Sequence, residues 1–295
     1  MTVLELPTVD SGAPALTPPR GRVLRRLRRN PLAVLGFTVV LVAVGAALLA
    51  DLVAPYPFAR TDFSAALKPP SGAHWFGTDY LGRDQFSWVL YGLRASVLVG
   101  AMAVGLSMVV GVPLGLLAGY YGFLDPLVSR LTDTLLAFPF LVLAVGLAAI
   151  LGPSLGTATV AIGVAQIPQV VRVTRGETLR LRGMDYVTAA IAGGARDGTV
   201  LRRHILPNAI NTLIVQATVA APAAIIGEAV LSFLGLGVRP PTPSLGIMLA
   251  SAQPFFRQGP WMAVFPGVSI VALTLALNLV GDGLRDAFDP QESRR

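Results

Sequence analysis

The sequence predicts an all-α, polytopic membrane protein with six transmembrane helices. Of its 295 residues, 54% are hydrophobic and only 13% are charged, about half the charged share of a soluble domain. Six windows are apolar over about the length that a helix needs to cross a hydrocarbon core of about 30 Å. Cations also gather on one side of the predicted membrane. This composition excludes an ordinary soluble protein and a disordered one.

The six predicted spans follow one another along the chain and are separated by polar segments. The second contains only Ser96 and Ser107 as polar side chains, and the fourth is the weakest because Gln166 and Pro168 soften its end. The six windows are 32–50, 95–118, 135–151, 157–171, 212–233 and 261–280. We expect Glu228, in the fifth, to lie near the outer interface and to need no burial, because it stands about 31 Å along a helix from the inner end.

The arginines set the predicted orientation. Segment 1–29 contains prolines and ends in six arginines, which predicts a flexible basic cytoplasmic tail before a first transmembrane helix at 30–53. The tail is too long for the n-region of a signal peptide, so an uncleaved anchor fits better. With the N-terminus inside, 17 of the 23 Lys and Arg residues lie inside, which predicts cytoplasmic termini, including a tail at 284–295. The net charge of +7 therefore indicates no nucleic-acid partner.

Several kinds of chemistry are absent from the sequence. There is no cysteine, and Lys68, the only lysine, is followed by two prolines, so no phosphate-binding loop of the GxxxxGK[ST] type exists. His74 and His204 are the only histidines and belong to no hydrolase motif. We therefore predict no catalytic, cofactor-binding or metal-binding residue, and no ATPase site of the chain's own.

The segment 174–206, on the predicted inner side, is far too long for a turn. Its middle, 184–195, predicts a short helix with Asp185 as N-cap. One face of this helix is apolar and made mostly of small residues: Val187, Ala190, Ile191 and Gly194. Such a helix suits insertion into a groove of a partner protein. The alternative is a helix lying on the lipid headgroups, with Arg202 and Arg203 touching anionic lipid.

The segment 54–93, on the predicted outer side, contains aromatic residues beside glycines, aspartates and an arginine. The candidates for a gate or for the docking of an external protein are Trp75, Phe76, Asp79, Arg83 and Asp84. The alternative is an interfacial aromatic belt with turn glycines.

Polar and small residues inside the spans form two further patterns. Asn208, Thr212 and Gln216 recur every four residues and form one stripe, which either lines a passage or hydrogen-bonds to another helix. Gly111, Gly115 and Gly119 form two overlapping GxxxG patterns, which predict close contact with a neighbouring helix.

Several blocks of the sequence resemble one family. Residues 76–84, FGTDYLGRD, and 92–96, GLRAS, are similar to the FGTDxLGRD and GxRxS signature of the C-type permease subunits of oligopeptide/dipeptide (peptide/nickel) ABC importers. Further blocks of the same subunits are matched at 135–139, 203–208, 228–237 and 278–286. The blocks occur in the family's order from about residue 32 to 290.

The resemblance implies a type I ABC importer permease fold. It implies an extracytoplasmic loop at 54–93 and a permease core of five transmembrane helices at 94–283, including a coupling loop at 174–206. The stretch 185–194 resembles the family's coupling motif, but Thr188 replaces its glutamate and Ile191 a frequent arginine. The residues implied to contact the ATPase are Asp185, Tyr186, Ala189, Ala190, Gly194, Arg203 and His204.

The function implied is half of the translocation pathway of an ATP-driven importer of short peptides in the bacterial cytoplasmic (inner) membrane. Its expected partners are a B-type permease, two ATP-binding subunits or one fused double ATPase that binds ATP and Mg²⁺, an extracytoplasmic substrate-binding protein, and membrane lipid. The same machinery for nickel chelates, glutathione or another small solute is the alternative. A stand-alone ion-coupled carrier is less well supported, because the spans contain almost no ionisable residue at mid-membrane depth.

Overall fold

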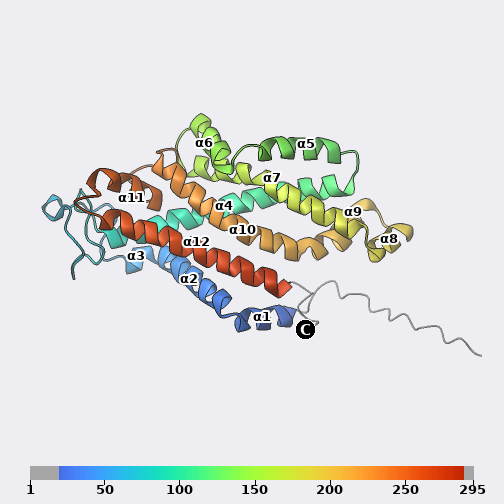
Figure 1. Cartoon of the computed structure of the whole chain (residues 1–295), viewed down its shortest axis with the longest axis horizontal. Coiled ribbons are helices and arrows are strands. Elements are labelled where there is room, and N and C mark those ends of the chain that lie inside the picture. The colour runs from blue at the N-terminus through green and yellow to red at the C-terminus, as the bar shows by residue number, and fades with distance from the viewer. Residues whose placement is uncertain (1–19, 289–295) are drawn as a thin grey trace, which may run out of the picture.

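The computed structural model describes residues 20–288, and this part of the chain consists of helices and loops without a β-strand (Figure 1). The helices are α1 (Arg20–Arg29), α2 (Pro31–Leu48), α3 (Ala50–Val53), η1 (Phe63–Ala65), α4 (Gln85–Tyr120), α5 (Asp125–Leu136), α6 (Phe140–Leu151), α7 (Leu155–Arg182), α8 (Asp185–Ala192), α9 (Asp197–Thr199), η2 (Val200–Ile205), α10 (Leu206–Phe233), α11 (Leu245–Ala252), η3 (Gln253–Phe255) and α12 (Trp261–Phe288).

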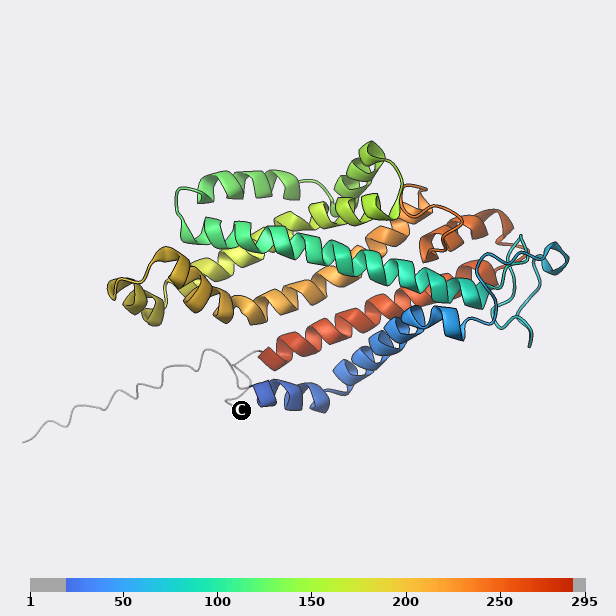
Figure 2. The same cartoon turned by 180° about the vertical axis from the view of Figure 1, so that it is seen from behind.

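Four long helices, α4, α7, α10 and α12, run along the length of the molecule (Figures 1 and 2). The short helices α8 and α9 lie at one end of this bundle, and α11 lies at the other end together with the loop that precedes α4. Helices α5 and α6 flank one side, and α1 and α2 flank the opposite side. The two ends of the bundle therefore carry different structures.

Within residues 20–288, four helical segments are long and apolar enough to cross a membrane: α2, α4, α10 with the turns before it, and α12. The bent pair of α5 and α6 adds a fifth if the two helices together form one broken span. Helix α7 carries the window predicted at 157–171, but Gln166, Gln169 and Arg172 lower its hydropathy and it is not among the five. The count of six spans stays a prediction.

The prediction of one continuous third helix over 135–151 is wrong. The chain breaks between Leu136 and Phe140, and α5 and α6 meet at 90°. Pro139, the N-cap of α6, has a ψ of 134°, outside the helical region, and a proline also disfavours helical backbone at the residue before it. The 12 residues of α6 rise only about 18 Å, which is less than the hydrocarbon thickness.

Helices extend beyond the predicted segment boundaries at four places. Helix α4 takes in the end of the outer segment 54–93, α7 takes in the start of segment 174–206, and α12 runs past 283 to Phe288. Residues 20–29 form α1, where a flexible tail was predicted; the rest of that tail, 1–19, and residues 289–295 lie outside the described residues. Hydropathy marks only the apolar part of a helix, whereas capping sets its end.

The glycine pattern at 111, 115 and 119 packs α4 against α7, as predicted. A Cβ atom on Gly115 would lie 2.6 Å from the Cβ of Thr174, and one on Gly119 would lie 2.6 Å from the Cβ of Thr178. A Cβ on Gly111 would lie 2.8 Å from Val170. These distances leave no room for a side chain, so the glycines allow the two helices to touch.

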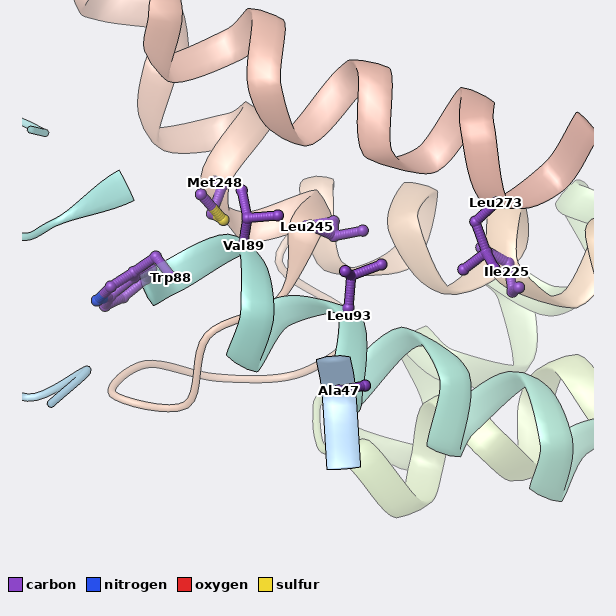
Figure 3. Packing of buried hydrophobic residues seen from close by; sticks show 8 residues of the cluster. All are labelled: Ala47, Trp88, Val89, Leu93, Ile225, Leu245, Met248 and Leu273. Atoms are coloured by element: carbon purple, nitrogen blue, oxygen red, sulfur yellow. The ribbon is translucent and has the colours of Figure 1, made fainter. Parts of the chain in front are cut away.

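A buried hydrophobic cluster holds the end of the bundle where α11 lies (Figure 3). Trp88 and Leu93 of α4 pack with Leu245 and Met248 of α11 and with Leu273 of α12. With Ala47 of α2 and Ile225 of α10, the cluster joins five helices. It therefore fixes the start of α4, from which the outer loop (residues 54–84, predicted to lie on the outer side) extends.

Candidate functional site

The short helix predicted at 184–195 is present as α8, but its start differs from the prediction. Its N-cap is Met184, which provides no side-chain hydrogen bond, and Asp185 is the first helical residue. Asp185 as N-cap is therefore wrong. As an acidic residue in the first turn, it still favours the helix through the helix dipole.

The residues of the predicted apolar face of α8 do not share one environment, because some are buried in the protein and others are exposed. Val187 is 0% exposed and packs with Leu181 and Val200, while Ile191 is 44% exposed. The exposed side is made by Thr188, Ala189 and Ala192 with Ile191. The prediction of one presented face from Val187 to Gly194 is therefore wrong: Val187 anchors the helix, and small residues on the other side stay available.

Gly194 ends α8 in a Schellman motif. Its φ is +81°, the left-handed region in which glycine avoids a steric penalty. The Gly194 amide donates to the carbonyl of Ile191 and the Ala195 amide donates to that of Ala190, both at 3.0 Å. No heavy atom lies within 4 Å of a Cβ built on Gly194, so the backbone conformation, and not packing within this chain, requires the glycine.

Arg203 and His204 connect α8 to α10. Both lie in the π-helical turn η2, where Arg203 is exposed and His204 is half-buried. The His204 carbonyl accepts a hydrogen bond from Asn208 Nδ2 at 2.6 Å and one from the Tyr186 hydroxyl at 3.4 Å. Burial raises the pKa of Tyr186 above its ordinary value. These two hydrogen bonds connect α8 with the first turn of α10.

In the outer loop, Asp79, Arg83 and Asp84 build the loop itself. Asp79 is buried and accepts hydrogen bonds from the amides of Leu81 at 2.8 Å and of Arg83 at 2.9 Å, as well as from the Arg83 guanidinium. Asp84 caps α4 by accepting from the Ser87 amide at 2.8 Å. These contacts hold the acidic and basic side chains inside the loop.

The two aromatic residues predicted for this surface lie in different environments. Phe76 stacks on Phe265 of α12 with ring centroids 3.9 Å apart, which fastens the loop to the bundle. Trp75 is 60% exposed and leans on Phe86. Of the five residues predicted for this surface, Trp75 is the exposed one and is available to another protein.

The stripe Asn208, Thr212 and Gln216 lines a groove of about 570 Å³ between α7, α10 and α12. Glu177 and Arg180 of α7 and Arg285 of α12 line it as well. Gln216 and Val219 also line a second hollow of about 440 Å³ toward α5 and α6. The stripe thus faces open space, and the two hollows follow one side of α10.

The burial of Glu228 differs from the sequence prediction. This residue is 0% exposed, so the expectation that it needs no burial is wrong. Its carboxylate accepts hydrogen bonds from the hydroxyls of Ser96 at 2.6 Å, Ser232 at 2.7 Å and Ser244 at 2.8 Å. The one local signal was Ser232, four residues on, because Ser96 and Ser244 are brought near by the fold. Among the described residues, no group of three His, Cys, Asp or Glu side chains is placed to hold a metal ion.

The fold and the site thus define an all-helical membrane protein with several apolar spans, a polar groove along α10 and an exposed short helix at one end. A family model described as binding-protein-dependent transport system inner membrane component matches residues 111–294. A second, described as the N-terminal transmembrane domain of oligopeptide transport permease C, matches residues 19–70. The chain belongs to this family of permease subunits of ABC importers, in which the ATPase is a separate partner.

Several relatives align with most of the chain. The dipeptide transport system permease protein DppC of Alkalihalophilus pseudofirmus is 42% identical over 92% of this chain and 90% of its own length. The DppC protein of Haemophilus influenzae is 42% identical over 90% and 92%. The glutathione transport system permease protein GsiD of Pectobacterium atrosepticum is 42% identical over 90% and 89%.

A solved structure supports the fold. An inward-facing structure of the MetNI methionine ABC transporter matches 68% of this chain and 97% of its own chain with a TM-score of 0.57 at 20% identity. The likeness confirms the type I importer permease fold. An importer permease of this kind works with a second permease, an ATPase and a substrate-binding protein, and the chain is a multi-pass membrane protein.

Proposed function

We propose that the chain is the permease of an importer for short peptides in the bacterial cytoplasmic membrane. Two relatives at 42% identity are named as dipeptide permeases, which supports peptide as the cargo. A relative named for glutathione is equally similar, and this supports glutathione or another small solute, such as a nickel chelate, as the alternative.

The observation that carries the proposal is the groove of about 570 Å³ along α10. Its lining combines amides and a hydroxyl with the aliphatic side chains of Val215 and Val219, which suits the mixed polarity of a peptide. A groove on one chain becomes a closed passage when a second chain covers it. A B-type permease as that second chain makes each subunit half of the pathway.

Coupling to ATP hydrolysis takes place through α8. Its exposed side carries Thr188, Ala189 and Ala192, small side chains that suit a cleft of an ATPase. ATP and Mg²⁺ are bound by that partner, either as two separate subunits or as one fused double ATPase. The Tyr186 and Asn208 contacts to His204 carry the movement into α10 and its groove.

The test is ATP-driven uptake of a labelled dipeptide by the complete importer in proteoliposomes, with its binding protein. Thr212→Val removes a hydroxyl that lines the groove, and we expect uptake to fall about two- to tenfold, the value of a lost hydrogen bond. Thr218→Val is the matched control, because the Thr218 hydroxyl donates to its own helix at Val215.

The outcomes separate the parts of the proposal. Uptake of glutathione or a nickel chelate in place of dipeptides by the unmodified importer overturns the cargo but keeps the machinery. Equal uptake by the Thr212→Val and Thr218→Val importers would show that the groove is not part of the translocation pathway.

A further inference from the structure

A groove of about 340 Å³ lies where α1, α2 and α12 meet. Its lining is mostly apolar: Leu27, Arg28, Ala33, Val34, Phe37, Thr38, Val280 and Leu284. Phe37 is 61% exposed, so a large aromatic side chain borders open space on the membrane-facing side of the molecule.

The groove persists because α2 and α12 are already in contact and cannot close over it. A Cβ on Gly36 would lie 2.7 Å from the carbonyl oxygen of Ala276, and one on Gly283 would lie 2.4 Å from the Cβ of Ala33. The two helices touch at these glycines. The space beside the contact is therefore left for something other than this helix pair.

Polarity divides the groove into a charged end and an apolar remainder. The Thr38 hydroxyl donates to the carbonyl of Val34 in its own helix at 2.8 Å, so it needs no polar ligand. Arg28 borders the groove, and Arg25 and Arg29 of the same helix are exposed too. An occupant that matches both parts has a long apolar portion and an anionic end.

The charged end lies where phospholipid headgroups are expected. Helix α1 lies beside the C-terminal end of α12, in the half of the molecule that ends in α8 (Figures 1 and 2), and the positive-inside rule assigns that half to the cytoplasmic side. Arginines near that surface attract anionic lipid by about 1 kcal/mol each. A soluble anion would make no contact with the apolar lining, and a neutral lipid would gain no charge attraction from the arginines.

We propose that this groove is a binding site for one anionic phospholipid of the cytoplasmic leaflet, with an acyl chain along Val34, Phe37 and Val280 and the phosphate at Arg28 and Arg25. This assignment is independent of the transported cargo. It gives α1 a role: the helix holds a headgroup against the first transmembrane helix.

Site-specific quenching in nanodiscs of the complete importer tests the proposal. Because this chain has no cysteine, Phe37→Cys carries a single fluorophore once the partner subunits are made cysteine-free. Quenching by nitroxide-labelled phosphatidylglycerol is divided by quenching by nitroxide-labelled phosphatidylcholine. Leu41→Cys is the matched control, because Leu41 is 62% exposed on the same helix but does not line the groove.

We expect the ratio to be well above one at position 37 and close to one at position 41. Arg28→Gln should lower the ratio at position 37 about fivefold, whereas Arg28→Lys should keep it. Inorganic phosphate should change it no more than chloride at equal ionic strength, which separates a lipid site from a phosphate site. Equal ratios at both positions overturn the proposal, and so does a fluorophore that neither lipid quenches, because a partner helix then fills the groove.

Discussion

Glu228 ties three parts of the chain together through serine hydroxyls. Ser96 belongs to α4, Ser232 to α10 and Ser244 to the start of α11. The hydroxyls of Ser232 and Ser244 accept backbone amides from Val238 and Gly246, so their protons are directed to the carboxylate. Glu228 is therefore an acceptor at the crossing of three elements.

Replacing Glu228 by Leu should destabilise the protein, because it leaves three buried hydroxyls without this acceptor. Each buried polar group left unpaired costs about 1–3 kcal/mol. Glu228→Gln keeps the oxygen that faces Ser232 and Ser244 and should cost about 1 kcal/mol. Thermal unfolding of the purified importer compares the two variants. Equal stability of Glu228→Leu and the unmodified chain would contradict this role.

Trp75 and Asp79 lie in one loop, but we expect their replacement by alanine to have different effects. Trp75→Ala removes an exposed aromatic side chain and should weaken the binding protein's stimulation of ATP hydrolysis about tenfold or more, as for an interface anchor. Asp79→Ala removes the acceptor of two amides and a guanidinium. It should make the loop sensitive to protease, which is the measurement that distinguishes the two. Unchanged stimulation in Trp75→Ala would favour the interfacial aromatic belt.

Among the elements, the α4–α7 pair depends on its glycines. Gly115→Ala places a Cβ 2.6 Å from that of Thr174 and should destabilise the protein by about 1–3 kcal/mol, the usual cost of overpacking. Gly105→Ala on the same helix is the control, because nothing lies within 4 Å of its Cβ and alanine favours helix. Denaturant titration of both variants measures the difference, and a Gly115→Ala as stable as Gly105→Ala would argue against this packing.

Helix α8 depends on the conformation of Gly194. Gly194→Val forces a β-branched residue to φ +81° and should cost about 1–2 kcal/mol, which unwinds the end of the helix. Gly194→Asn tolerates this region and should retain the turn. Hydrogen exchange at residues 190–196 reports the turn, and dipeptide uptake per ATP hydrolysed reports coupling. If Gly194→Val loosens the turn but uptake per ATP hydrolysed is unchanged, coupling does not depend on the conformation of this turn.

Which elements the sequence predicts depends on the range of the interactions that form them. Helices α2, α4 and α12 follow from contiguous apolar residues, and the contact of Gly115 follows from a local glycine repeat. The 90° turn between α5 and α6 was missed because hydropathy treats the chain there as one apolar run, although Pro139 is a local signal for the break. The burial of Glu228 was missed because two of its three serines come from other elements.

At the scale of the whole molecule, the two ends of the bundle carry different structures. The outer loop and α11 lie at one end, and α8 and α9 lie at the other (Figures 1 and 2). The sequence predicted this division from the distribution of its arginines, and the resemblance named the partners on each side. The structure adds the polar groove along the N-terminal half of α10, in the part of the bundle that ends in α8.

The orientation of this bundle in the membrane is directly testable, because the chain has no cysteine of its own. Phe63→Cys introduces a thiol at an exposed position of the outer loop, and Ala189→Cys introduces one on the exposed side of α8. With the termini cytoplasmic, a membrane-impermeant maleimide should label position 63 in intact cells and position 189 only after the membrane is permeabilised. The reverse pattern would invert the topology. It would also move α8 away from any cytoplasmic ATPase, and the arginines of α1 away from the cytoplasmic leaflet.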